Sequence, residues 1–407
     1  MNARTLLCLT LLASAGVAPT SGRAASDLRS VAIVMSAGVQ APAYGALRPY
    51  AGRRWPNWAL PAGSLTPHGA LLVTALGASY RASYTRAGFL NAGDCREANG
   101  ISVVTSDRPS TAATAAAFLA GLAPDCDVAY TRAPAGADPI FHPVPDIAKA
   151  DPAAAAGSLR AALGSDPNGL TPGDAASLAR LEALLDCAAY DCTRVSTLGG
   201  SIVTDSSTGL ASLRGPVAVG GAAVDALRAE YAGALPAQNV GWGHLDLDLL
   251  RDLSQMSVLR ARLEDRNPYA ARVTASNLAA HVLASLTGRS GRLSAFVGLE
   301  TNVAQLAGLL DATWSLPGDP RNDTPPGGAL VFERYAADRR AGRKSDEVRI
   351  FFVAQPFGAM RRATPGSPVP VTRVPVAIAG CPDTGCPVET FEQLVKRAID
   401  PAFVTPV

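Results

Sequence analysis

The chain has 407 residues, of which 48% are hydrophobic and 17% are charged. It is therefore a globular chain, long enough for two domains or for one large domain with an insertion. Its formal net charge is only +2 and no block of like charge stands out. This charge distribution gives no footprint for nucleic acid or for an anionic lipid surface, so we expect neither as a partner.

The first 24 residues differ from the rest. Arg4 precedes the short apolar run TLLCLTLLASAGVA, and SGRAAS then offers small residues for cleavage near Ala24. The apolar run is too short to span a bilayer, and we expect no membrane span. The sequence therefore predicts a signal peptide over residues 1–24 and a mature protein released into a periplasm or the medium.

Six cysteines remain once Cys8 of the signal segment is set aside. An even number of cysteines in an exported chain indicates disulfides. A zinc site is disfavoured because no cluster of histidines or acids accompanies their spacing. The spacing favours local pairing, and the expected disulfides are Cys95 with Cys126, Cys187 with Cys192, and Cys381 with Cys386.

The N-terminal part of the mature chain alternates strand and helix. RSVAIVMS is typical of a buried strand, and a helix is expected to begin at Thr66-Pro67. ISVVTS (101–106) predicts a second strand, STAATAAAFLAGL a helix, and DVAYTR a third strand. Such alternation indicates a mainly parallel α/β sheet flanked by helices.

Residues 143–285 have a different character, with Ala-rich and Leu-rich amphipathic segments and almost no strand signal. The strand-loop-helix pattern returns at RLSAFVGLETN (292–302), and GALVFERY and DEVRIFFVAQ are expected to pair as a hairpin. The simplest account is an α/β core formed by residues 25–142 and 286–407, interrupted by an all-helical insertion domain at 143–285.

Several long segments resemble one known family. WPNWALPAGSLTPHG, AAFLAGLAPDC and LAGLLDATWSLPGDPRNDTPPGGALVFE are similar to segments of the histidine acid phosphatases, in the branch of bacterial phytases and periplasmic glucose-1-phosphatases. The order and spacing fit from about residue 29 to 395. The resemblance implies the same fold and, for a standard member, hydrolysis of phosphate monoesters. We expect no cofactor and no metal.

The resemblance also locates the family's catalytic motif. After the first strand, members carry Arg-His-Gly-x-Arg-x-Pro, in which the histidine takes the phosphoryl group and the arginines bind phosphate. Here the arginine, histidine and second arginine are replaced by Ser36, Ala37 and Gln40, while Gly38 and Pro42, which shape the loop, remain.

Two further family motifs depart from the pattern. A phosphate-binding arginine before the AFLAGL helix falls at Ser110, although Arg108 is placed to substitute in part. The family's His-Asp pair, a phosphate contact and the acid that protonates the leaving group, corresponds to Leu299 and Glu300. The expected cleft therefore consists of Ser36, Ala37, Gln40, Arg108, Ser110, Leu299 and Glu300, with no residue assigned a catalytic role.

Four interpretations remain open. The chain is an engineered knockout, a phosphatase of the family that uses non-standard residues, an enzyme repurposed to other chemistry in the same cleft, or a non-catalytic binding protein. Changes in three separate motifs argue against engineering. Ser36, Ser110 and Glu300 would be the polar groups of a repurposed enzyme, but no histidine base accompanies them. We favour the non-catalytic interpretation.

The four histidines give little support to an alternative mechanism. His68 is expected at the surface where a helix begins, and His281 inside a helix as a satisfied core residue. His142 and His244 fall in loop-like contexts. GHLDLDLL places His244, Asp246 and Asp248 at alternating positions, a faint metal-site spacing that is more simply the start of a helix.

The substitutions also predict the ligand. With the family's cations replaced, the cleft floor should be neutral to slightly acidic, with Glu300 as its main charge. A helix beginning near Asn302 would direct its N-terminal dipole at this floor. Such a pocket favours an uncharged or cationic small molecule, such as a polyol, sugar or amine, over a phosphate ester. A protein partner at the rim is the other expectation.

Overall fold

The computed structural model describes residues 27–91, 95–166, 168–288, 292–337, 345–382 and 385–406. The expected signal peptide, residues 1–24, lies outside these ranges. Within them, every helix is too short or too polar to cross a membrane.

Eight strands of the described chain form one sheet in the order β10-β8-β7-β1-β6-β2-β3, with β9 paired to β8. The strands are β1 (Leu28–Ser36), β2 (Ile101–Thr105), β3 (Thr131–Arg132), β6 (Leu293–Gly298), β7 (Ala329–Tyr335), β8 (Glu347–Ala354), β9 (Thr372–Pro375) and β10 (Cys386–Pro387).

Strand β1 lies at the centre of the sheet. It runs parallel to β6 and antiparallel to β7, and β2 runs parallel to the other side of β6. All residues of β1 from Ser30 to Ser36 are buried, as its unbroken apolar run predicts for a strand covered on both faces. Strands β7 and β8 form the predicted hairpin. The third predicted strand is reduced to Thr131–Arg132 at the sheet edge, where both residues are exposed.

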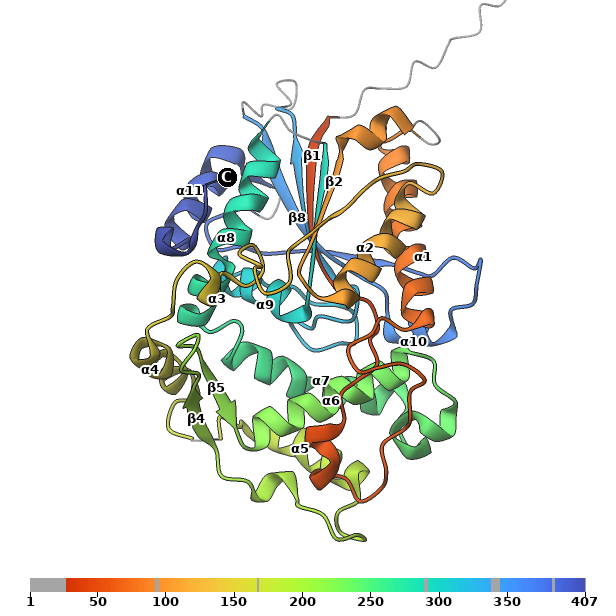
Figure 1. The fold of residues 1–407 in the computed structure, drawn as a ribbon, viewed down its shortest axis with the longest axis vertical. Helices are drawn as coiled ribbons and strands as arrows, with labels where there is room; N and C mark the ends of the chain where they lie inside the picture. Colours follow the sequence, from red (N-terminus) through yellow and green to blue (C-terminus); the bar gives the residue numbers. More distant parts are fainter. Residues whose placement is uncertain are drawn as a thin grey trace, which may run out of the picture.

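Helices cover both faces of this sheet (Figure 1). The alternating side chains of β1 divide between two cores: Val31, Ile33 and Met35 pack under α1 (Pro67–Arg86) and α2 (Pro109–Leu122). Ala32 and Val34 face the opposite layer. That layer contains α8 (Pro268–Thr287), α9 (Glu300–Leu309) and α11 (Val388–Ala398). The predicted α/β fold, a central sheet flanked by helices, is confirmed.

Helix α1 begins where the sequence predicts. Thr66 caps it, its side-chain oxygen accepting a hydrogen bond from Gly69 N at 2.9 Å, and Pro67 occupies the first turn. Helix α1 packs very closely on α2, because Gly77 faces the carbonyl of Phe118 and Gly121 faces the carbonyl of Thr74. These two helices hold the loop that follows β1.

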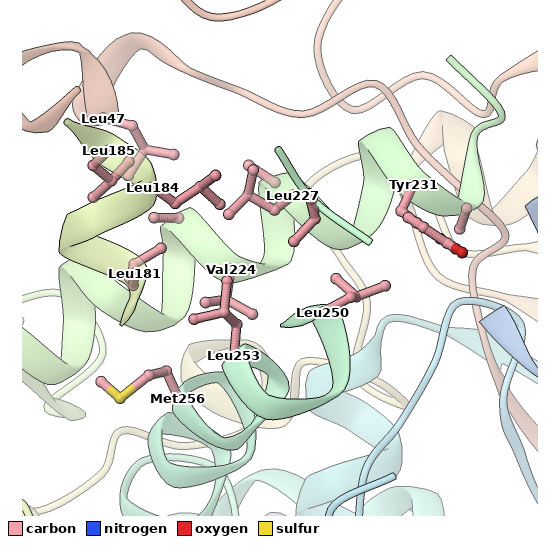
Figure 2. Close-up of a cluster of buried hydrophobic side chains, with 14 of the residues drawn as sticks. Leu47, Leu181, Leu184, Leu185, Val224, Leu227, Tyr231, Leu250, Leu253 and Met256 are labelled. Atoms are coloured by element: carbon pink, nitrogen blue, oxygen red, sulfur yellow. The ribbon is translucent and has the colours of Figure 1, made fainter. Parts of the chain in front are cut away.

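A second group of helices lies beyond one end of the sheet (Figure 1). It contains α5, α6 and α7, whose apolar side chains form a separate core that includes Leu181, Val224, Leu227, Leu253 and Met256 (Figure 2). The helices of this group are α5 (Pro172–Leu185), α6 (Pro216–Ala232) and α7 (Leu247–Leu263).

The other helices of the described chain are α3 (Pro143–Asp146), α4 (Pro152–Leu163) and α10 (Phe357–Arg362), with 3₁₀ turns at Gly45–Tyr50, Cys95–Gly100, Val195–Thr197, Ala237–Gly243 and Pro401–Phe403.

The segment expected to be all helical also contains a hairpin. Strands β4 (Ser201–Thr204) and β5 (Ala211–Arg214) pair antiparallel, with Ile202 opposite Leu213. Each strand has only four residues and mixes polar with apolar side chains. The alternation is therefore too brief to be recognised as a strand pattern in the sequence. The all-helical expectation is corrected by this hairpin.

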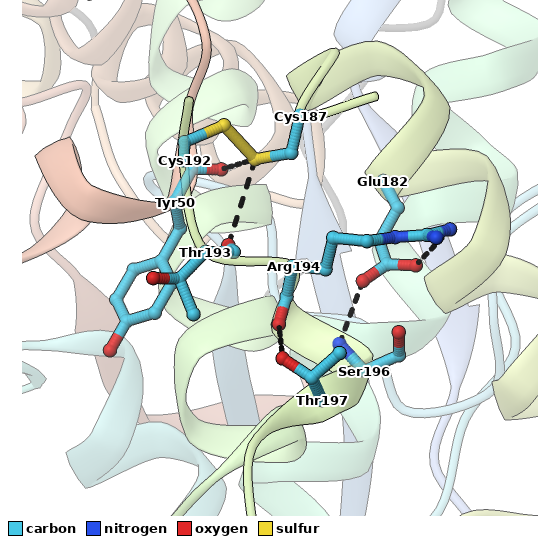
Figure 3. Close-up of a disulfide and its surroundings, with 8 residues drawn as sticks. All are labelled: Tyr50, Glu182, Cys187, Cys192, Thr193, Arg194, Ser196 and Thr197. Carbon is cyan, nitrogen blue, oxygen red and sulfur yellow. Dashed lines mark hydrogen bonds and ion pairs between the residues drawn. A yellow bond between two sulfur atoms is a disulfide. The ribbon is translucent and has the colours of Figure 1, made fainter. Parts of the chain in front are cut away.

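Three disulfides are present: Cys95 with Cys126, Cys187 with Cys192, and Cys381 with Cys386. These are the pairs that the cysteine spacing favours, and they fit an exported protein. The Cys187–Cys192 bridge closes the turn after α5 (Figure 3). Close by, Glu182 accepts a hydrogen bond from Ser196 N at 2.7 Å. The disulfide and this contact fix the chain that leads from α5 toward β4.

Candidate functional site

The candidate site lies where the parallel strands end. Ser36, the last residue of β1, pairs with Gly298, the last residue of β6, and Thr105 of β2 pairs with Val297. The loops after these three strands therefore emerge side by side. In α/β proteins, ligands bind in the crevice beyond the carboxyl ends of the strands. The expected cleft residues come from these loops.

The loop after β1 is held tightly by its neighbours. Ser36 is fully buried and its hydroxyl donates to the carbonyl of Pro325 at 3.3 Å. Ala37 is also fully buried. The Gly38 N–H donates to Thr114 Oγ1 at 3.1 Å, and a Cβ at Gly38 would lie 2.7 Å from Val73 Cγ2. A glycine is therefore required for the loop to pass this close to α1.

Helix α9 begins at Glu300, two residues earlier than expected. The side chain of Asn302 explains the earlier start: its Oδ1 accepts a hydrogen bond from Leu299 N at 2.8 Å, while its Nδ2 donates to Phe141 O at 2.9 Å. Glu300 thus occupies the first turn, where the helix dipole favours a carboxylate.

The cleft residues expected from the sequence do not all face one space. A cavity of about 400 Å³ opens at this edge of the sheet, and Gln40 and Glu300 line it. Ser36, Ala37, Ser110 and Leu299 lie behind its surface or beside it. Arg108 points elsewhere, since its side chain is 60% exposed and its Nε lies 3.6 Å from Asp107 Oδ1.

The far wall of the cavity carries most of its charge. Helices α6 and α7 and the segment before β7 contribute two guanidinium groups and several carboxyl groups to the lining. The charged lining residues are Asp225, Arg228, Arg260, Asp265, Glu300 and Asp323. The expectation that Glu300 is the main charge of the cleft is corrected: it is one of four carboxyl groups that face two arginines.

Both arginines are engaged by carboxylates. Arg228 Nη2 lies 2.7 Å from Asp323 Oδ1, and its Nη1 donates to Ser257 Oγ at 2.9 Å. Arg260 Nη2 lies 2.5 Å from Asp225 Oδ2. The Asp323 side chain has 0% exposure, and its second carboxylate oxygen, Oδ2, has no hydrogen-bond partner within the described chain.

Three carboxyl groups that line the cavity, Asp265, Asp323 and Glu300, have raised pKa values. Burial raises the pKa of Asp265 to about 7 and the pKa of Asp323 to about 6, in each case against the attraction of an arginine. The surrounding protein atoms also raise the pKa of Glu300 by desolvation, although its side chain is exposed to the open space of the cavity. Asp265 and Asp323 therefore accept protons near neutral pH.

Sequence reasoning missed the arginines. Arg228 is separated by 95 residues from Asp323, and no local pattern marks either as a cleft residue. Asp225 and Arg228 stand three residues apart on α6, which is the spacing of an ordinary surface ion pair on a helix. The two side chains line the cavity because α6 lies across the ends of the strands.

The histidines are placed as follows. His68, half-buried at the start of α1, lies with Nε2 2.8 Å from the carbonyl of Met360. His281 is only half-buried and its Nε2 has no hydrogen-bond partner in the described ranges, so the expectation of a satisfied core histidine is wrong. Asp246 caps α7 by accepting from Leu249 N at 2.8 Å, as the helix-start interpretation predicts.

Comparisons with known proteins agree with this architecture. A family model described as histidine phosphatase superfamily (branch 2) matches residues 19–160. Phytase AppA of Escherichia coli (strain K12) is 29% identical over 408 residues, covering 92% of this chain and 93% of that protein. A glucose-1-phosphatase of Salmonella typhimurium is 27% identical over 366 residues, covering 84% and 85% of the two chains.

Solved structures show the same similarity along nearly the whole chain. The apo form of Hafnia alvei phytase superposes with a TM-score of 0.86 at 28% identity, covering 95% of this chain and 100% of that chain. The same phytase in complex with myo-inositol hexakis sulphate gives a TM-score of 0.85 at 28% identity, with coverages of 94% and 100%. Residues 19–160 thus match the branch 2 model of the histidine phosphatase superfamily, and nearly the whole chain is similar to bacterial phytases and glucose-1-phosphatases.

Proposed function

We propose that this protein is a non-catalytic member of its family that binds an uncharged or cationic small molecule in the cavity at the strand ends. Ala37 carries the proposal. It stands at the end of β1, where the family motif has its nucleophilic histidine, and a methyl group cannot accept a phosphoryl group. None of the cavity-lining residues in the described chain is a histidine.

The charges of the cavity support the absence of phosphate chemistry. Phosphoryl transfer gains its rate from positioning and from cations around the transferred group. An unlike charge at about 4 Å contributes roughly 4 kcal/mol at intermediate dielectric. Arg228 and Arg260 each already contact a carboxylate at 2.7 and 2.5 Å. A phosphate dianion would have to displace those carboxylates, which neutralise both cations.

The same wall suits a ligand that donates hydrogen bonds. The acceptor oxygens of Glu300 and Gln40 face the open space of the cavity. Hydroxyl groups of a polyol or sugar, or the N–H groups of an amine, would satisfy these acceptors. The volume of about 400 Å³ is in the range of small-molecule sites.

A phosphate-release assay tests the loss of catalysis. Purified protein is incubated at acidic pH with phytate, glucose-1-phosphate and an aryl phosphate, and no turnover above a buffer blank is expected. Turnover that persists through repurification, and that elutes together with the protein, would contradict the proposal and favour a phosphatase using non-standard residues.

A thermal-shift screen tests the ligand class, because a ligand that binds the folded state raises the melting temperature. At pH 7.5 we expect stabilisation by myo-inositol, glucosamine or putrescine, and none by inorganic phosphate or phytate. Glu300→Gln should reduce the shift caused by amines, since it removes a carboxylate from the cavity. Glu392 on α11 is an exposed carboxylate paired with Lys396, and Glu392→Gln is therefore the matched control. This control variant should not change the shift caused by amines.

Stabilisation by phytate or phosphate alone, at micromolar concentrations, would show that the charge argument is wrong. A screen in which none of these compounds acts would leave the assay result standing and would direct attention to a protein partner at the rim.

A further inference from the structure

A second group of polar side chains lies apart from the cavity. Asp107 follows β2 in the turn before α2, and Asp138 and His142 lie in the loop that leads to α3. One ligand atom from each side chain lies within 4.8 Å of the others. His142 Nε2 is 3.9 Å from Asp138 Oδ2. None of the three lines the cavity described above.

One carboxylate oxygen and one imidazole nitrogen of this group are buried without a hydrogen-bond partner in the described chain. They are Asp107 Oδ1 and His142 Nε2. Buried polar atoms in native proteins are almost always satisfied, and an unsatisfied group indicates a missing water or ion. Here the unsatisfied atoms belong to a carboxylate and an imidazole that converge on a third ligand, which is the donor set of a divalent metal.

Both carboxylates accept hydrogen bonds from the backbone, and in Asp138 both oxygens do so. Asp107 Oδ2 accepts from Gly136 N at 3.3 Å. Asp138 accepts from Phe141 N at 3.3 Å and from Asp107 N at 3.1 Å. These bonds orient the side chains before any ion arrives, as outer contacts do in metal sites. Asp138 is also 3% exposed, and a carboxylate this deeply buried requires a positive partner.

The charged groups around the cluster include one competitor. Arg108 Nε lies 3.6 Å from Asp107 Oδ1, the atom assigned to the metal. The Arg108 side chain is 60% exposed, so it can turn into solvent at little cost. Arg132 bonds the backbone carbonyl of Asp107, and Asp146 accepts from the N–H of Asp138, so neither occupies a ligand atom.

We propose that Asp107, Asp138 and His142 bind one zinc ion. Imidazole nitrogen and carboxylate oxygen bind Zn²⁺ at about 2.0–2.2 Å, which places tetrahedral ligand atoms about 3.4 Å apart. Side-chain rotations would have to bring the three atoms from their separations of up to 4.8 Å to this spacing, and water would complete the shell. No spacing in the sequence marks the site, because Asp107 and His142 are 35 residues apart and no cysteine is involved.

The ion would have a structural role. It would join the turn after β2 to the loop of residues 138–142, which contacts two helices through its backbone. Asn302 at the start of α9 donates to Phe141 O at 2.9 Å, and Asn277 of α8 donates to Pro139 O at 2.8 Å. Zinc would therefore stabilise the segment that fixes the first turn of α9.

Calorimetric titration with zinc chloride tests the site. The full mature protein is stripped with a chelator and dialysed before titration at pH 7.5. We expect one zinc per chain with a micromolar or lower Kd. His142→Asn and Asp107→Asn should each weaken binding at least tenfold. His244→Asn, which changes an exposed histidine elsewhere, should leave the Kd unchanged. Arg108→Gln should tighten binding severalfold because it removes the competing cation.

Melting temperatures separate binding from folding. Without metal, His142→Asn and Asp107→Asn should melt within a few degrees of the wild type, and zinc should raise the melting temperature of the wild type but not that of these two variants. The absence of saturable zinc binding by the wild type would overturn the assignment. Equal binding by the wild type and His142→Asn would overturn it as well.

Discussion

Arg228 on α6 and Asp323 in the segment before β7 form a nearly fully buried ion pair across the candidate site, with Nη2 and Oδ1 2.7 Å apart. The two side chains are 7% and 0% exposed. The same guanidinium donates to the carbonyl of Thr324 at 3.1 Å, and its Cζ lies 5.1 Å from the centre of the Phe357 ring. This one residue therefore links the helical group to the chain that enters the sheet.

Breaking this pair should be costly, whereas removing both partners should be less so. Arg228→Met leaves Asp323 buried without its cation, and we expect a loss of roughly 3–5 kcal/mol in the free energy of unfolding. The double variant Arg228→Met/Asp323→Asn should lose less than the sum of the two single variants, by at least about 1 kcal/mol. Chemical denaturation of all four proteins measures this. Strictly additive losses would show that the pair is not coupled.

The titration of Asp265 predicts how stability depends on pH. Burial raises its folded pKa to about 7, well above the ordinary value of an aspartate. The folded protein therefore binds more protons than the unfolded chain between about pH 4 and 7. The stabilising contribution of Asp265 to the free energy of unfolding is fully present below the pKa of the unfolded chain and is lost as the pH rises through 7.

Asp265→Asn should remove this pH dependence. Relative to the wild type, the variant should become more stable as the pH is raised from about 4 to 8, by on the order of 2 kcal/mol. Arg260, Asp225 and Glu264 also act on this carboxyl group. Melting curves across this range, with Glu392→Gln as the surface control, measure the difference. A difference that stays constant with pH would contradict the raised pKa.

The space around two glycines predicts opposite effects on stability when each is replaced by alanine. A Cβ at Gly121 would lie 1.9 Å from the carbonyl oxygen of Thr74, whereas a Cβ at Gly157 in α4 would meet nothing within 4 Å. Gly121→Ala should therefore lower stability by at least about 2 kcal/mol, since the two helices must move apart. Gly157→Ala should raise it by about 0.5–1 kcal/mol through helix propensity. Urea denaturation of both variants decides this, and a stable Gly121→Ala protein would show that the helices separate easily.

The parts of the fold that follow from local patterns were predictable. The apolar run of β1, the Thr66-Pro67 start of α1 and the two strands of the β7–β8 hairpin each have a signal within about ten residues of sequence. The four-residue strands β4 and β5 are too short to give one. Hydrophobic periodicity did not indicate which loop holds the site, and this prediction came from the resemblance to the family.

The charge of the cavity could not be predicted in the same way. Arg228 and Arg260 reach the site because α6 and α7 cross the strand ends, and this is a property of the tertiary arrangement. The substitutions at Ala37 and Leu299 were visible in the sequence. Their electrostatic surroundings were not, because each arginine is neutralised by a carboxylate from another part of the chain or another turn of helix.

The last prediction concerns the recovery of phosphatase activity. If the loss of the family's motif residues is the reason for inactivity, Ala37→His alone should not restore turnover. A histidine at this position would lack the cations that hold a phosphate dianion and stabilise the transition state. Ser36 and Ala37 are both fully buried, so a larger side chain at either position must displace its neighbours.

Restoring the whole set should give measurable turnover. The variant carries Ser36→Arg, Ala37→His, Gln40→Arg, Ser110→Arg, Leu299→His and Glu300→Asp. We expect it to release phosphate from an aryl phosphate at acidic pH, though slowly, because Asp225 and Asp323 still neutralise Arg260 and Arg228. Replacing the new histidine at position 37 with alanine in this background is the control and should abolish the activity. A cooperatively melting rebuilt protein with no turnover would show that the wall formed by α6 and α7, and not the motif loop alone, prevents phosphatase chemistry.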